Sequence, residues 1–250
     1  MNTRRKFIIQ GSMATTAVLA LKPFTSIASA ASFFTGPDGS NSQLVFLHTS
    51  NVNPSVDYRV INFIKEIKNK NANAILLKAG QDEPEETGRL TYDVSMNGGN
   101  DLSAITGDYK IINKGNLRTG IISAKPGESD IIEKVNTLST YLKKEKDCTV
   151  VVCLSSLGYK NKNAPDDITM AKKSRHLDII IGGHAKNFQT NPIIALNSKN
   201  EEVIIHSASG DLFACGIIKI DFDGQGRKKH IGFTDQSSKN TAPHRAMPAA

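Results

Sequence analysis

Short runs of β-branched and apolar residues alternate with amphipathic segments along most of the chain. Apolar runs that end at a glycine or a polar residue predict buried strands, and apolar positions three and four apart predict helices. The predicted strands are residues 44–48, 74–79, 117–124, 149–154 and 179–181, and the predicted helices are residues 56–67, 129–145 and 166–174. We also expect a helix over residues 85–96, where the pattern is weaker.

The pattern changes after residue 190. Residues 192–196, 202–206 and 215–222 read as strands joined by Asn, Gly and Asp turns, and residues 221–226 carry a loop or hairpin signal. Alternating strands and helices followed by a β-rich part predict a layered α/β sandwich. We expect one domain over residues 43–236, after a flexible lead-in at 31–42 and before a disordered tail at 237–250.

The central feature of this pattern is the strand at residues 179–181, which reads Ile-Ile-Ile and is followed by Gly182, Gly183 and His184. We expect it to lie inside a sheet, flanked by the strands at 149–154 and 202–206. Ligands of open α/β sheets bind at the carboxyl ends of strands, which makes His184 a candidate site residue. The alternative is a plain strand exit, with His184 bonded to a nearby carbonyl.

The first thirty residues read as a targeting segment. Residues 3–8, Thr-Arg-Arg-Lys-Phe-Ile, resemble the twin-arginine export signature through Arg4 and Arg5. A mildly apolar stretch follows and ends in an A-x-A cleavage pattern formed by Ala28 and Ala30. We therefore expect export by the twin-arginine route to the periplasm, with the mature chain beginning near Ala31.

A membrane anchor at this segment is the rival interpretation. It needs about 18–20 uninterrupted apolar residues, and Lys22 with Pro23 breaks the run too early. Four basic residues and no acid lie before residue 31, so the formal net charge of +7 becomes +3 without the segment. There is no dense basic stripe with interleaved aromatics, so we expect no nucleic-acid binding. Because the apolar run is broken, we also expect no stable membrane anchor after cleavage.

Three cysteines, Cys148, Cys153 and Cys215, give neither a disulfide framework nor a zinc motif. Cys148 and Cys153 are five residues apart in an expected strand, so we expect them to face opposite ways and not to pair. We expect buried thiols, and a bridge from Cys215 to one of the others stays open.

The stretch 178–186, D-I-I-I-G-G-H-A-K, resembles the D-x-I-I-G-G-H-x-H segment of calcineurin-like metallophosphoesterases, in the branch that includes the 5′-nucleotidases. In that family both histidines bind metal. Here His184 matches the first, and Lys186 stands in place of the second.

Four further motifs of the family occur earlier in the chain, in the same order as in the family and each at a predicted strand end. The H-T-N-D-x-H motif appears with Asn51 and Asn53 in place of an aspartate and a histidine ligand, and the A-G-D motif has Gln81 in place of the bridging carboxylate. The G-N-H-E motif matches loosely, with Asp108 for the ligand asparagine and Tyr109 for the catalytic histidine. In L-S-H-L-G-Y the ligand histidine has become Ser156.

The resemblance implies a metallophosphoesterase-type fold whose metal site is degenerate. The family holds two divalent ions about 3.5–4 Å apart, which need negative ligands. Neutral amides, a serine and an added lysine cannot supply that charge, and Asp108 with His184 would hold one ion weakly at most. We therefore expect no metal cofactor and no metal-dependent hydrolysis.

These observations favour a catalytically inactive, exported relative of the 5′-nucleotidases with a binding or assembly role and an unidentified partner. One alternative is a residual phosphoesterase with non-standard ligands. Another is a metal-free binder of a small anion, because the side chains at the degenerate site are neutral or positive hydrogen-bond donors. A polar cluster satisfied by water and its own members is the simplest interpretation of those residues.

Overall fold

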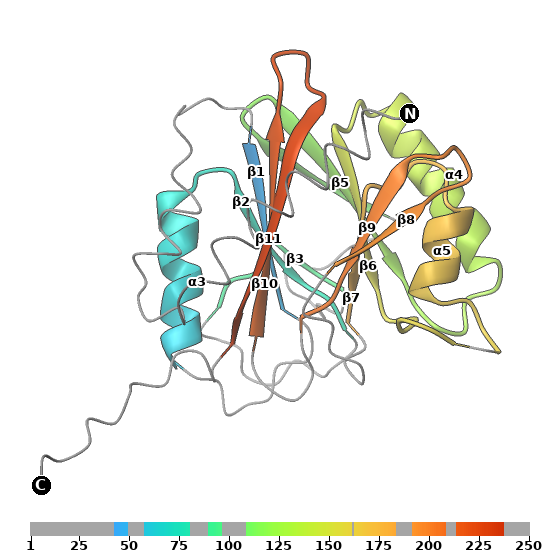
Figure 1. Cartoon of the computed structure of the whole chain (residues 1–250), viewed down its shortest axis with the longest axis horizontal. Helices are drawn as coiled ribbons and strands as arrows, with labels where there is room; N and C mark the ends of the chain where they lie inside the picture. The colour runs from blue at the N-terminus through green and yellow to red at the C-terminus, as the bar shows by residue number, and fades with distance from the viewer. Residues whose placement is uncertain are drawn as a thin grey trace, which may run out of the picture.

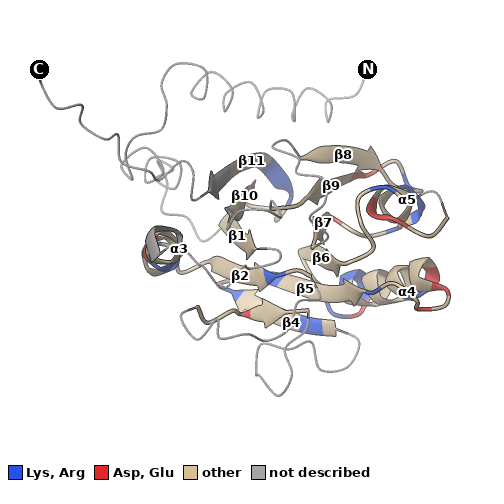
Figure 2. Ribbon diagram, turned by 90° about the horizontal axis from the view of Figure 1, so that it is seen from below, with Lys and Arg blue, Asp and Glu red and all other residues tan. Residues whose placement is uncertain are grey.

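The structure is a computed structural model, and it describes residues 43–49, 58–80, 90–96, 109–161, 163–183, 192–208 and 214–237. Two mixed β-sheets pack face to face, with α3 (Tyr58–Lys70) on the outside of one and α4 (Ile131–Lys144) and α5 (Asp167–Lys173) on the outside of the other (Figures 1 and 2). This arrangement confirms the layered α/β sandwich. Among the described residues, no helix is long and apolar enough to cross a bilayer.

The first sheet has the strand order β11-β10-β1-β2-β3. Strands β1 and β2 run parallel, and β10 and β11 form an antiparallel hairpin beside β1. The strands are β1 (Gln43–Thr49), β2 (Ala74–Lys78), β3 (Val94–Ser95), β10 (Ala214–Phe222) and β11 (Lys228–Ser237).

The second sheet has the strand order β4-β5-β6-β7-β9-β8. Its centre, from β5 to β9, is parallel, and the edge strands β4 and β8 are antiparallel to their neighbours. The strands are β4 (Tyr109–Lys114), β5 (Leu117–Ala124), β6 (Val150–Ser155), β7 (Ile179–Gly182), β8 (Ile193–Leu196) and β9 (Glu202–His206). The predicted interior strand is confirmed, because β7 lies between β6 and β9.

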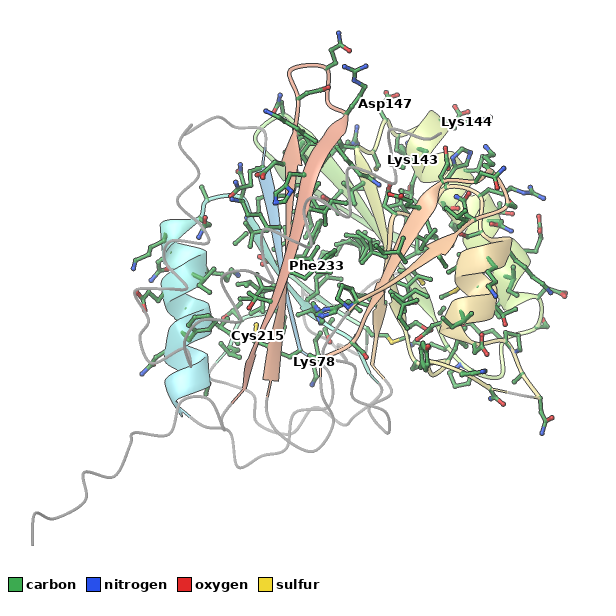
Figure 3. All side chains as sticks on the ribbon, viewed as in Figure 1. Lys78, Lys143, Lys144, Asp147, Cys215 and Phe233 are labelled. Atoms are coloured by element: carbon green, nitrogen blue, oxygen red, sulfur yellow. The ribbon has the colours of Figure 1, made fainter. Side chains whose placement is uncertain are left out.

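Alternation along the strands divides the apolar residues into three layers of core. Even-numbered residues of β1, such as Phe46, join β7 residues Ile179 and Ile181 between the two sheets, where side chains fill the space (Figure 3). Val45 and Leu47 face α3 instead. The helix side of the second sheet buries Ile180 against α4 and α5. Strands buried on both faces explain the continuous apolar runs of the sequence.

Two predictions of local structure are wrong. The helix expected over residues 85–96 is contradicted at 90–96, and its first part, 85–89, lies outside the described residues. Val94 and Ser95 instead pair with the edge of β2, and the Asp93 carboxylate accepts a 2.7 Å hydrogen bond from the Leu76 amide. Cys148 and Cys153 do not face opposite ways, because β6 begins at Val150 and both thiols join the helix-side core. All three cysteines are buried and free.

Candidate functional site

The carboxyl ends of the parallel strands from both sheets meet at one edge of the sandwich. Gly183, just after β7, lies so close to the end of β2 that a Cβ placed on it would overlap the backbone of Gly80 and come within 2.6 Å of the Ala79 carbonyl carbon. A glycine that ends a strand abruptly allows a tight turn or a close approach, and the structure shows a close approach to the backbone of the other sheet. This contact brings the ends of two predicted motifs together.

Backbone hydrogen bonds join the remaining strand ends to this contact. The Ala79 amide donates to the Thr49 carbonyl at 3.0 Å, and the Gly183 amide donates to the Ser155 carbonyl at 2.7 Å. The Ser156 amide donates to the Ala124 carbonyl at 3.0 Å. The ends of β1, β2, β5, β6 and β7 therefore form one connected rim.

Six of the predicted site residues lie outside the described residues, as do the four residues singled out in the expected export segment. They are Asn51, Asn53, Gln81, Asp108, His184 and Lys186, and Arg4, Arg5, Ala28 and Ala30. The structure does place the described residues that precede three of them. Gln81 follows Gly80, His184 follows Gly183, and Asn51 comes two residues after Thr49. The residues that precede Asn51, Gln81 and His184 are therefore close together on the rim.

Two predicted site residues are described. Ser156 is buried, with 8% of its surface exposed, and sits on the rim just after β6. Tyr109 begins the edge strand β4, pairs with Ile122, and packs on the helix side of the sheet, with its ring 5.7 Å from the ring of Tyr141 in α4. The structure therefore brings Ser156 to the rim and places the Tyr109 ring in the outer layer.

A pair of buried histidines, which the sequence analysis does not single out, bridges the two sheets just below the rim. His48 Nε2 of β1 and His206 Nδ1 of β9 are 2.6 Å apart, so one ring donates to the other. Gly216 of β10 leaves room for the pair, because a side chain there would overlap the His48 ring. Burial lowers the pKa of His48 well below 6.5 and that of His206 to about 4, so both rings are neutral at pH 7.

A buried carboxyl group supports the rim from the helix side. Asp167, in the first turn of α5, accepts a short hydrogen bond from the Ser155 hydroxyl, and its backbone amide donates to the Gly158 carbonyl at 2.9 Å. The Ser155 hydroxyl oxygen in turn accepts a 3.2 Å hydrogen bond from the Leu157 amide. Asp167 thereby fixes the loop that carries Ser156. Burial raises the pKa of Asp167 to about 7, although its bond from Ser155 opposes the rise.

These groups could not hold a pair of divalent ions by themselves. Within the described ranges, no three His, Cys, Asp or Glu side chains are grouped as metal ligands. The buried histidines bond to each other, and Asp167 faces Ser155 on the other side of the sheet. The chemistry of the rim therefore depends on the residues that extend from it.

Solved structures with the same fold include two nucleotidases. The 5′-nucleotidase precursor from Thermus thermophilus matches with a TM-score of 0.57 at 16% identity, over 79% of this chain and 55% of that chain. The NAD nucleotidase from Haemophilus influenzae matches with a TM-score of 0.54 at 13% identity, over 78% of this chain and 49% of that one. This chain spans about half the length of these proteins. No protein-family model matches the chain, and no curated protein matches it significantly.

At these identities the likeness establishes the fold alone. The chain has a fold of the 5′-nucleotidase type of metallophosphoesterase, as the motif order predicts. Activity must be argued from the residues at the rim.

Proposed function

We propose that this protein is an exported relative of the metallophosphoesterases that has lost hydrolytic activity and functions by binding. The observation that carries the proposal is the combination of a preserved rim with altered residues next to it. Gly80 and Gly183 still bring the two sheets into contact, while the residues that follow them are Gln81 and His184, with Lys186 close behind.

The charge at this edge argues against two-metal chemistry. Two divalent ions close together need carboxylates to offset their charge, and a bridging carboxylate cannot be replaced by an amide oxygen. Asn51 and Gln81 are neutral, and Lys186 adds a positive charge. Ser156 is a weak ligand for such ions where the family has a histidine. The side chains at these positions are better suited to donating hydrogen bonds than to binding cations.

Metal binding is the direct test. The protein purified from the periplasm without chelator should carry well under one equivalent of Mn, Fe, Zn or Ni. A ligand present at 100 times its dissociation constant stabilises the fold by about 2.7 kcal/mol, or roughly 5–10 °C in melting temperature for a domain of this size. Adding these ions should raise the melting temperature by far less, and phosphomonoester and phosphodiester substrates should not be hydrolysed above background.

A restoration variant serves as the matched control. It combines Asn51→Asp, Asn53→His, Gln81→Asp, Ser156→His and Lys186→His and leaves Tyr109 unchanged, because that ring packs against Tyr141. The variant should gain a metal-dependent rise in melting temperature, although activity also needs supporting hydrogen bonds around the ligands. Stoichiometric paired metal or metal-dependent turnover in the unmodified protein would refute the proposal and make it a residual phosphoesterase.

A further inference from the structure

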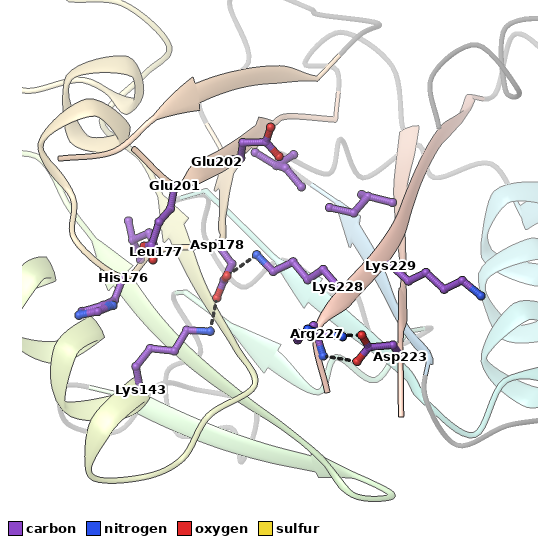
Figure 4. A pocket seen from close by; sticks show the side chains of 12 residues that line it. Lys143, His176, Leu177, Asp178, Glu201, Glu202, Asp223, Arg227, Lys228 and Lys229 are labelled. Atoms are coloured by element: carbon purple, nitrogen blue, oxygen red, sulfur yellow. Dashed lines mark hydrogen bonds and ion pairs between the residues drawn. The ribbon is translucent and has the colours of Figure 1, made fainter. Parts of the chain in front are cut away.

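A cavity of about 720 Å³ opens at the other end of the sandwich from the rim. It lies between the start of β7, the start of β9 and the turn that joins β10 to β11 (Figure 4). It is therefore distinct from the site proposed above, and the inference drawn from it rests on the proposed export but not on the loss of hydrolytic activity.

Charged groups around this cavity compensate one another. Asp178 pairs with Lys143 at 2.8 Å and with Lys228, and it also accepts a 2.7 Å hydrogen bond from the Val151 amide. Arg227 pairs with Asp223 at 2.8 Å (Figure 4). The Lys and Arg residues that line the cavity are matched in number by the Asp and Glu residues. The cavity thus has no excess charge to attract a phosphate, a nucleic acid or a free cation.

An apolar strip extends from the cavity to the edge of the second sheet. Leu177, Ile204 and Ile231 line the cavity. Ile204 of β9 is directly opposite Ile194 of β8, so the two side chains share a face of the sheet. Ile194 and Leu196, on the same face of β8, are 38% and 46% exposed and are the exposed large hydrophobic residues of the described part of the chain. A neutral cavity that continues into an apolar strip suits a peptide segment with few charges.

We propose that residues 31–42 fold back over this end of the sandwich and place Phe33 and Phe34 against the apolar strip. The segment, A-S-F-F-T-G-P-D-G-S-N-S, has two phenylalanines and a single charged residue, Asp38. Its composition therefore matches the balanced charge and the apolar surface of the cavity.

The position of β1 makes this contact possible. The segment leads directly into Gln43, whose side chain donates a 2.8 Å hydrogen bond to Asp221, two residues before the cavity residue Asp223. β11 is two strands away from β1, which is roughly 10 Å at the usual strand spacing, and the facing sheet with β9 and β8 is about a further 10 Å away. Phe34 precedes Gln43 by nine residues, enough chain to span up to about 30 Å when extended.

The absence of tryptophan from the chain provides a clean reporter. In the exported protein carrying Phe34→Trp, the single tryptophan should emit at a shorter wavelength than after denaturation, and acrylamide should quench it weakly. Adding Ile194→Asp and Leu196→Asp, at positions already exposed to water, should shift the emission to longer wavelength and increase quenching severalfold. Adding Asn113→Asp, an exposed residue on the opposite edge strand, should change neither.

Each other outcome contradicts the proposal. Strong quenching in the Phe34→Trp protein itself would show that the segment is exposed. Weak quenching that Ile194→Asp and Leu196→Asp do not alter would place the segment elsewhere. Protection that appears only as protein concentration rises, together with dimers in sedimentation, would identify a second copy as the occupant. Cooperative thermal unfolding of each variant ensures that all comparisons are made on folded protein.

Discussion

Asp167 is a carboxyl group that the fold keeps from water in the first turn of α5. Its carboxylate accepts a hydrogen bond from the Ser155 hydroxyl. It also lies against Gly182, because a Cβ placed on that glycine would be 3.0 Å from Asp167 Oδ2. Both neighbours belong to strand ends that form the rim. The protonation of this one residue is therefore coupled to the packing of the candidate site.

The raised pKa of Asp167 predicts how stability depends on pH. The folded state keeps the proton up to about pH 7, whereas the unfolded chain loses it near 3.8, so this residue reduces stability as pH rises between those values. The full effect is on the order of 4 kcal/mol by linkage. Asp167→Asn, which imitates the protonated acid, should remove the decline. Urea unfolding from pH 4 to 8 measures the difference between the two proteins.

The buried histidine pair gives the opposite slope. The pKa of His206 is lowered to about 4 in the folded state. Below pH 6.5 the unfolded chain therefore binds more protons than the folded state does, and the free energy of unfolding falls as pH drops. His48 acts in the same direction. Both histidines are present in the Asp167→Asn variant, so subtracting the two stability curves isolates Asp167. A difference that does not change with pH would show that Asp167 is ionised in the folded protein at pH 5.

Sequence reasoning reaches some of these residues and misses others for a physical reason. The sequence shows that a strand ends abruptly at Gly182 and Gly183, and the structure shows why glycine is required at 183. Asp167 follows Asp166 at a helix start, where both acids look like ordinary capping residues; Asp166 does cap, accepting from the Thr169 amide at 2.6 Å. Only the fold shows that Asp167 turns into the sheet. Likewise, nothing in the sequence joins His48 to His206, because they are 158 residues apart.

The elements that could be predicted include the strands buried on two faces, and also β8, β10 and the three amphipathic helices. Strands β1, β2, β5, β6, β7 and β9 have continuous apolar runs, and their bounds agree with the predictions to within a residue or two. β3 has two residues and β4 is half exposed, so neither carries a run long enough to identify. β4 begins at Tyr109 and forms a hairpin with β5, which makes the loose G-N-H-E alignment at Tyr109 the weakest of the five.

The contact between β7 and the end of β2 can be tested at Gly183. Gly183→Ala would force its methyl group into the backbone of Gly80, and backbone cannot move aside as a flexible side chain can. We expect a loss of about 3 kcal/mol or more in the free energy of unfolding, at the upper end for overpacking. Chemical denaturation with a two-state fit provides the measurement.

Gly224→Ala is the matched control for that substitution. Gly224 lies in the β10–β11 turn, has open space where its Cβ would be, and does not have a left-handed backbone conformation. The control should change stability by no more than about 0.5 kcal/mol, as most surface changes do. Equal stability for Gly183→Ala and Gly224→Ala would mean that the two sheets do not meet at this point.

At the scale of the whole molecule, the fold does not determine the chemistry of the site. The layered α/β sandwich seen in the nucleotidases is present here, and five motifs in order were enough to predict it. The order of the strands was predicted only around β7. The residues that follow the rim can be read from the sequence, but how they lie relative to one another is outside the described residues. The assignment of these residues to one site therefore stays a prediction, and the structure supplies only the rim from which they extend.

The proposed export route is a property of the whole precursor. A twin-arginine receptor reads the arginine pair itself, and transported proteins cross the membrane already folded. Replacing Arg4 and Arg5 by two lysines keeps the charge but removes the guanidinium groups, which lysine does not imitate. In a bacterium with this route, we expect nearly all of the variant to stay in the cytoplasm as uncleaved precursor. Cell fractionation and the mass of the protein would show this.

The neighbouring basic residue provides the control for that experiment. Lys6→Arg leaves the arginine pair in place and keeps the charge, so this variant should be exported and cleaved near Ala31 like the unmodified protein. If the double-lysine variant is also processed at the normal rate, the segment directs general secretion instead. The protein would then fold only after crossing the membrane, and its three buried thiols would stay exposed to an oxidising compartment until folding is complete.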